Sequence, residues 1–309
     1  MLGVAGTRHV LASAGYPWIA PLSAFYPEAQ REIDLSRWNG EFLPGSLKAK
    51  RGQGNTSRLR PDYVALRSVS SASESGAYEW AIVESKGTRR SVTTLNQCPA
   101  DWHHQVRNVQ LEVHESPQAV ARHLVVATRV NPNAVRDTTR RISIRAWNSE
   151  SVETPRVPLD AVADIAAAHV FGLCHKFQLT NSAHALALAV NRWGNARSGS
   201  QKKEPRREEE EILGRAEDEL RRAKLPPVQL REELIQMELS PAIINLTKRL
   251  WAARTTSEAA EALGPAELLL SKERVEQVEP QEGQHPSRDA VRRDRVATAS
   301  GVIVWIERR

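Results

Sequence analysis

Two segments with the composition of β-strands, 62–69 and 78–86, flank a short polar stretch and constrain the fold of this chain most strongly. Residues 62–69 alternate apolar and polar side chains, which is the pattern of a half-buried strand. Residues 78–86 include Trp80 and Ile82, whose bulky side chains favour strands. The small, polar residues 70–77 predict a hairpin connection. We therefore expect two adjacent strands here.

Helical and strand patterns continue on both sides of this pair. Residues 26–35 and 100–113 predict helices, the second with an apolar side and with Asp101 near its start. Residues 123–130 and 141–147 predict two further strands. The order helix, strand, strand, helix, strand, strand indicates an α/β domain over residues 1–155.

The composition changes after residue 155, where a mostly helical C-terminal region begins. We expect this region to span 156–278 and to end in a flexible, polar tail over 279–309, of which 279–300 is disordered. A short terminal strand at 302–306 is expected to lie at a sheet edge. The helices predicted in the C-terminal region are 159–179, 182–193, 205–224, 229–237, 242–253 and 257–270.

Charge and composition limit the possible partners and setting of the chain. Its 309 residues carry a net charge of +6 and give a pI near 9.5, which favours a polyanionic partner. The two cysteines cannot form a disulfide framework, so a cytoplasmic setting is expected. Residues 1–18 are mildly apolar, but Thr7, Arg8 and His9 interrupt them. They lack the order of a signal peptide, and we expect no membrane span.

The ends of the two central strands carry the residues of a candidate metal site. Pro61-Asp62 opens the first strand and Glu84-Ser85-Lys86 closes the second, and each pattern occurs once. Alternate strand residues point to one face, so Glu84 and Lys86 form a same-face pair. Magnesium prefers carboxylate and carbonyl oxygens, which Asp62, Glu84 and the Ser85 backbone can supply. Lys86 could then polarise water or stabilise developing charge.

With these residues, the sequence resembles the PD-(D/E)xK, or restriction-endonuclease-like, nuclease superfamily. The resemblance covers roughly residues 26–147 and implies a mixed sheet flanked by helices. It implies that Asp62 and Glu84 bind Mg²⁺ or Mn²⁺ and that Lys86 serves catalysis of phosphodiester hydrolysis, most often in DNA. Gln105 resembles a glutamine that some branches place on the following helix. Either Glu28 or Glu32 could match a further acid that some members carry on their first helix.

Basic residues near this site are candidates for contacts with nucleic-acid phosphates. The segment 48–60 is expected to form a loop without any acidic residue, and two arginines follow Lys86 closely. The candidates are Lys48, Lys50, Arg51, Arg58, Arg60, Arg89 and Arg90.

Three functions remain open at this point. The first is a metal-dependent deoxyribonuclease, with a role in bacterial defence or DNA processing that rests on analogy with the family. The second is a nuclease-like module that binds nucleic acid or protein without catalysis. The third is a helical regulatory or assembly protein. In each case the C-terminal region could form a homo-oligomer or dock a protein partner.

Overall fold

The computed structural model describes residues 2–26, 45–51, 61–69, 77–88, 97–130, 142–149, 156–197, 207–230, 233–275, 292–298 and 301–308. The chain divides into two compact units. Unit 1 comprises residues 1–37 and 44–169, and unit 2 comprises 38–43 and 170–309. The boundary therefore falls within helix α3 (Leu159–Lys176) and not at the expected position near residue 155.

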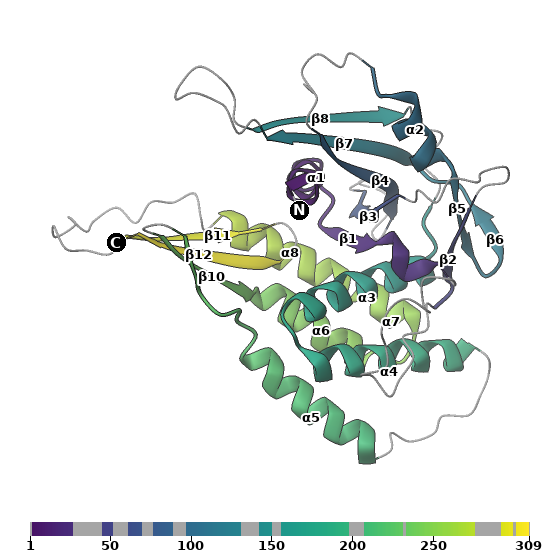
Figure 1. Ribbon diagram of the computed structural model, residues 1–309. Helices are drawn as coiled ribbons and strands as arrows, with labels where there is room; N and C mark the ends of the chain where they lie inside the picture. The colour runs from purple at the N-terminus through teal and green to yellow at the C-terminus, as the bar shows by residue number, and fades with distance from the viewer. Residues whose placement is uncertain are drawn as a thin grey trace. The chain divides into compact units, whose positions relative to one another are not determined.

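Unit 1 is built on a five-stranded mixed sheet with the order β1-β3-β4-β7-β8 (Figure 1). All neighbouring strands are antiparallel except β4 and β7, which are parallel. The predicted α/β class is confirmed, and so are the four strands that the sequence predicts for this unit; β1 is a fifth strand that the sequence analysis does not predict. The strands are β1 (Trp18–Pro21), β3 (Tyr63–Ser68), β4 (Tyr78–Thr88), β7 (Arg122–Val130) and β8 (Ile142–Ser149).

A second, three-stranded sheet of unit 1 corrects the prediction of a helix over 100–113. Helix α2 (Ala100–Arg107) ends early, and strand β5 (Val109–Val113) follows it. Strand β5 pairs with β2 (Leu47–Arg51) and β6 (Ser116–Gln118). The apolar residues of β5 also fit a period of two, and pairing with a strand distant in sequence selects this reading.

Helix α1 (Leu2–Ser13), which the sequence analysis does not predict, covers one face of the main sheet. Leu11 packs in the core there, and Val10 and Tyr63 pack against the same cluster. We call this the α1 face. Its strand residues include Ala65, Ala81, Val83, Leu124 and Val126.

Helix α2 covers the opposite face, which we call the α2 face. Val125 on β7 pairs with both Glu84 and Trp147, so these three side chains share one face. The rings of Trp102, on α2, and Trp147 meet edge to face with centroids 6.1 Å apart. The first part of α3 adds to this face, because the ring of His169 contacts that of Trp18.

Buried polar groups attach α3 and the 3-10 helix η1 (Leu22–Phe25) to the strands of unit 1. Asp164 Oδ2 accepts hydrogen bonds from the N–H groups of Ser46 and Leu47 at 2.7 and 2.8 Å. The N–H of Leu22 donates to the carbonyl of Asp62 at 2.9 Å. These bonds give partners to buried backbone groups that a loop would otherwise leave unpaired.

Unit 2 combines helices with a four-stranded sheet of order β11-β12-β10-β9. Glu219, on α5, caps the start of α4 by accepting from the N–H groups of Asn181 and Ser182. Most of the predicted helices are confirmed. The described elements are α4 (Thr180–Arg197), α5 (Arg207–Arg221), α6 (Pro241–Ala252), α7 (Thr256–Glu261), α8 (Leu263–Val275), β9 (Val228–Leu230), β10 (Glu233–Leu239), β11 (Arg292–Ala297) and β12 (Val302–Arg308).

The sheet of unit 2 corrects three predictions. Residues 229–237 belong to strands β9 and β10 and not to a helix. Within the stretch expected to be disordered, residues 292–297 form β11. The terminal strand β12 is longer than predicted and lies between β11 and β10 instead of at an edge. Strand β10 is rich in helix-forming residues, but pairing on both sides overrides that preference.

Among the residues that the structure describes, no helix has the length and apolar character needed to cross a bilayer.

Candidate metal centre

The backbone of Asp62 is held on both sides where strand β3 begins. Its N–H donates to the carbonyl of Val83 at 3.1 Å, and its carbonyl accepts from Leu22. Its side chain reaches across to β4, where Oδ2 accepts a hydrogen bond from the N–H of Ser85 at 2.8 Å. The structure therefore brings the Pro61-Asp62 string and the Glu84-Ser85-Lys86 string into direct contact.

Glu84 and Lys86 lie on the α2 face, two residues apart on β4. Lys86 Nζ is 2.5 Å from Glu84 Oε1, and the side chains are 22% and 5% exposed, respectively. The second oxygen, Glu84 Oε2, is buried and has no hydrogen-bond partner among the described residues. An ionised carboxylate with one unsatisfied buried oxygen is costly, so this site would gain from a cation.

The electrostatics of the two carboxyl groups support this conclusion. Burial raises the pKa of Glu84 to about 7, opposed by the hydrogen bond and charge of Lys86 and reinforced by the charge of Asp62. The Asp62 residue is exposed as a whole, yet desolvation of its carboxyl raises its pKa. The Ser85 N–H and the Lys86 charge oppose that rise. Two close carboxyl groups with raised pKa values form a site that a divalent cation would stabilise.

Ser85 and Gln105 lie on opposite faces of the sheet. Ser85 alternates with Glu84, so its side chain lies on the α1 face, where its Oγ is buried without a described hydrogen-bond partner. Gln105, on α2, is 5% exposed, and its Oε1 also lacks a described partner. Helix α2 packs against β4 and β7, which places Gln105 over the face that carries Glu84.

Basic groups on the α2 face surround His123, which pairs with Ile82 on β4. Burial lowers the pKa of His123 to about 4, and Arg107 and His103 lower it further by repulsion. His123 is therefore neutral at pH 7, while Arg107 brings a positive charge close to it.

The basic loop expected over 48–60 is partly a strand. Lys48, Lys50 and Arg51 belong to β2, because the alternation of Leu47 and Ala49 buries one side of this segment. Lys50 Nζ lies 2.6 Å from Glu112 Oε2. This ion pair offsets the positive charge of Lys50, which the sequence analysis predicts to contact phosphate. The other predicted residues Glu28, Glu32, Arg58, Arg60, Arg89 and Arg90 lie outside the described residues.

Within the described residues, no group of three or more His, Cys, Asp or Glu side chains could hold a metal ion. This finding does not conflict with a magnesium site, because Mg²⁺ usually takes one or two carboxylates and completes its shell with water and phosphate oxygens. Asp62, Glu84 and the Ser85 carbonyl remain the predicted ligands, and their chemistry fits such an ion.

Sequence reasoning missed Tyr63 as a neighbour of this centre, and Arg8 as a neighbour of Tyr63. Burial raises the pKa of Tyr63, the charges of Asp62 and Glu84 raise it further, and that of Arg8 lowers it. The sequence signal for Tyr63 is its position next to Asp62. Arg8 has none, because its helix is distant in the chain.

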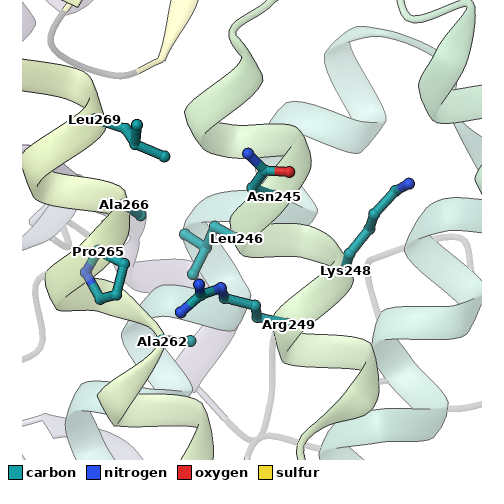
Figure 2. A pocket seen from close by; sticks show the side chains of 8 residues that line it. All are labelled: Asn245, Leu246, Lys248, Arg249, Ala262, Pro265, Ala266 and Leu269. Atoms are coloured by element: carbon teal, nitrogen blue, oxygen red, sulfur yellow. The ribbon is translucent and has the colours of Figure 1, made fainter. Parts of the chain in front are cut away.

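A pocket of about 300 Å³ lies between helices α6 and α8 of unit 2 (Figure 2). Arg249 points toward α8, while Lys248 points away from it. The lining contains no carboxylate and none of the predicted site residues, so the pocket is a poor candidate for a metal site. Its lining residues are Asn245, Leu246, Lys248, Arg249, Ala262, Pro265, Ala266 and Leu269.

Comparisons with protein-family models, curated proteins and solved structures found no match. A function is therefore argued from the geometry of Asp62, Glu84 and Lys86 alone.

Proposed function

We propose that this protein is a metal-dependent nuclease that hydrolyses phosphodiester bonds, with DNA as the expected substrate. The observation that carries the proposal is the environment of the Glu84 carboxyl group. Its carboxyl is buried, one oxygen contacts Lys86, the other has no described partner, and Asp62 is close enough to raise its pKa.

The order of elements around the centre supports a restriction-endonuclease-like fold. Strands β3 and β4 are antiparallel, and helix α2 follows β4; after β5 and β6 of the second sheet, the chain enters β7, which is parallel to β4. Asp62 directly precedes β3, and its carboxylate contacts β4 at Ser85, in the part of β4 that continues beyond its pairing with β3. This arrangement agrees with the hairpin, helix and strand that the sequence resemblance implies.

Each residue has a distinct role in the proposed reaction. Asp62, Glu84 and the Ser85 carbonyl would hold Mg²⁺ or Mn²⁺, which when bound activates water and neutralises charge on a phosphate. Lys86 would hold or donate a proton at Nζ and stabilise the negative charge that develops on the phosphate. Gln105, buried on α2 with an unpartnered Oε1, would orient the attacking water.

A nuclease-like module that binds nucleic acid without cleaving it is the second candidate. The specific observation in its favour is the direct ion pair between Lys86 and Glu84, which uses one carboxylate oxygen. If this pair persists when nucleic acid binds, metal would be excluded and the site would act by charge alone.

A cleavage assay on single- and double-stranded DNA and RNA in Mg²⁺, Mn²⁺ and EDTA tests the proposal. We expect metal-dependent cleavage by the wild type and its loss in Lys86→Ala and Asp62→Ala. Lys224→Ala, which removes an exposed lysine paired with Glu238 in unit 2, is the matched control and should remain active. Activity that survives both site substitutions would overturn the assignment, and binding without cleavage in every metal would favour the second candidate.

A further inference from the structure

Two arginines share the α2 face with the candidate metal centre. Ala127 on β7 pairs with both Lys86 on β4 and Arg145 on β8. Paired residues of neighbouring strands project to the same face, so Lys86, Ala127 and Arg145 form one row across the sheet. Neighbouring strands lie about 4.8 Å apart, which places the Cα atoms of Lys86 and Arg145 roughly 10 Å from each other. A second cation therefore occupies the row of the proposed catalytic lysine.

Arg129 lies in the next row of the same face. It pairs with Thr88, two residues beyond Lys86 on β4, and with Ser143, two residues before Arg145 on β8. Diagonal neighbours on antiparallel strands are about 7–8 Å apart, so Arg129 and Arg145 are close. We call Lys86, Arg129 and Arg145 the cationic strip.

The side chains of the cationic strip reach solvent. Ala127, which separates Lys86 from Arg145, carries only a methyl group. Lys86 is 22% exposed, and both arginines are half-buried. Helix α2 lies over the other end of the face, near the C-terminal end of β8, where Trp102 meets Trp147 (Figure 1). The strip can therefore contact a ligand from solution.

Positive charge exceeds negative charge on this part of the face. On the described parts of β4, β7 and β8, Glu84 is the one acidic residue that shares the α2 face, and it pairs with Lys86. No acid on the same face of these strands balances the two arginines. This excess of positive charge favours a polyanionic ligand.

Trp147 holds the guanidinium of Arg145 in place. The Arg145 Cζ atom lies over the Trp147 ring, 5.7 Å from its centroid. Such a cation–π contact is attractive, and Trp147 is itself packed against Trp102. A planar guanidinium fixed in this way matches the oxygens of a phosphate and loses little freedom on binding.

The length of the cationic strip matches a short stretch of a nucleic-acid strand. Each strand of DNA carries one negative charge per about 3.4 Å of helix axis, so a length of roughly 10 Å spans about three phosphates. The strip offers its cations over that length, with Lys86 at the candidate metal centre.

We propose that Arg129 and Arg145 bind the phosphates next to the scissile phosphodiester, and that Trp147 positions Arg145 for this contact. This inference rests on the proposed nuclease function for the identity of the substrate as nucleic acid. In this scheme the bound strand runs from β4 toward β8. The two arginines bind the substrate, while the residues of the metal centre act at the scissile bond.

Binding without metal tests the two arginines separately from cleavage. Fluorescence anisotropy in EDTA would compare wild type with Arg129→Met and Arg145→Met on labelled DNA and RNA oligonucleotides, single- and double-stranded, across a salt series. Each substitution should weaken binding about tenfold and reduce the salt slope by about 0.7–0.9, as expected for one lost phosphate contact. A purely structural defect would leave the salt slope unchanged.

Arg295→Met is the matched control for both variants. Arg295 lies on β11 of unit 2, with its Cζ atom 5.8 Å from the centroid of the Trp305 ring. The control therefore removes the same charge and the same kind of ring contact as Arg145→Met. It should retain the wild-type affinity and salt slope.

A substitution at Trp147 tests its positioning role. Trp147→Phe weakens the cation–π contact while the charge of Arg145 remains. We expect binding to weaken by about threefold with an unchanged salt slope. Wild-type affinity of Trp147→Phe would overturn the role of Trp147.

The outcomes for the two proposals can be told apart. Wild-type affinity and salt slope in folded Arg129→Met and Arg145→Met would overturn the cationic strip as a phosphate site, and so would a wild type that binds none of the oligonucleotides. Lower affinity and salt slope in both variants of a protein that cleaves nothing would support the strip and reject the nuclease. Metal-dependent cleavage with unchanged kcat and KM in both variants would keep the nuclease and reject the strip.

Discussion

The N–H of Ser85 donates to Oδ2 of Asp62 at 2.8 Å, which fixes the Asp62 carboxyl against the backbone of the neighbouring strand. A backbone donor is a constraint that side-chain substitutions on β4 do not remove. Among the described residues, no hydrogen bond is recorded to the second oxygen, Oδ1. This bond joins the Pro61-Asp62 string to the Glu84-Ser85-Lys86 string. It also means that the charge of Asp62 can be removed by a substitution that keeps the hydrogen bond.

The first prediction concerns Asp62→Asn. The amide oxygen of asparagine can still accept from Ser85, so the fold should be retained while the negative charge is lost. We expect metal-dependent cleavage to fall by about 10²–10³-fold, as when one electrostatic contact to a transition state is removed. Single-turnover cleavage in Mg²⁺ measures this effect, and circular dichroism checks the fold. A rate within threefold of wild type would contradict the role of Asp62.

The second prediction concerns the pH dependence of stability set by Glu84. Its pKa is raised to about 7 from an ordinary value of 4.5, chiefly by burial. Its contribution to stability is therefore fully present below about pH 4.5 and is lost as the pH rises through 7. Glu84→Gln stays neutral, so its stability relative to wild type should be higher at pH 8 than at pH 5.

Urea unfolding in EDTA at the two pH values measures the effect of Glu84→Gln. Glu115→Gln, at an exposed position in the turn between β5 and β6, is the matched control and should change stability by less than about 0.5 kcal/mol. An equal effect of Glu84→Gln at both pH values would show that burial of its charge does not limit stability.

The third prediction concerns Glu79, a buried carboxylate on the α1 face, opposite the face that carries Glu84 of the candidate metal centre. The hydroxyl of Tyr16 donates to its Oε1, Arg122 Nε lies 2.7 Å from the same oxygen, and Arg67 lies 3.1 Å from Oε2. Burial acts to raise the pKa of Glu79, but the hydrogen bonds from Tyr16 and Arg67 and the charges of both arginines outweigh it and lower the pKa.

Glu79→Gln should therefore destabilise unit 1 by about 3–5 kcal/mol at pH 7, because two arginines lose their buried partner. A lowered pKa means that the stabilisation is present above the ordinary value of 4.5 and is lost as the pH falls through the lowered value. The cost of the substitution should accordingly shrink in acid. Urea unfolding at pH 7 and pH 3 measures this, and a cost that is independent of pH would contradict the ion-pair explanation.

Local patterns predict the strand pair and much of the site, because the information lies within a few residues. Strands β3 and β4 have their own composition signals, and their antiparallel pairing brings Asp62 to Glu84 and Lys86. The burial of Glu84 could not be predicted in this way. It depends on α2, which is placed over the sheet by packing such as the contact of Trp102 with Trp147.

The two stretches wrongly predicted as helical, within 100–113 and 229–237, also owe their structure to non-local contacts. Strand β5 pairs with β2, and β10 pairs with β12, so partners far along the chain override local helix preference. The helical character of α1 was hidden because Thr7, Arg8 and His9 interrupt its apolar pattern. Thr7 is buried and Arg8 is half-buried, so polar residues lie within the sheet-facing part of this helix and mask its helical pattern in the sequence.

The fourth prediction compares two glycines with opposite surroundings. A Cβ at Gly45 would lie 2.1 Å from Asp164 Oδ1, and this carboxylate cannot shift without weakening its bonds to Ser46 and Leu47. Gly45→Ala should therefore destabilise unit 1 by about 1–3 kcal/mol. Gly214, within helix α5, has no atom within 4 Å of an added Cβ, so Gly214→Ala should stabilise unit 2 by about 0.5–1 kcal/mol.

Hydrogen exchange read peptide by peptide can separate the two effects. Protection of β2 should fall in Gly45→Ala, and protection of α5 should rise in Gly214→Ala, because each substitution acts on its own unit. Faster exchange in α5 of Gly214→Ala would contradict the open surroundings of that glycine. Unchanged exchange in β2 of Gly45→Ala would mean that Asp164 can move at little cost, and its bonds to Ser46 and Leu47 would then not be what holds α3 to β2.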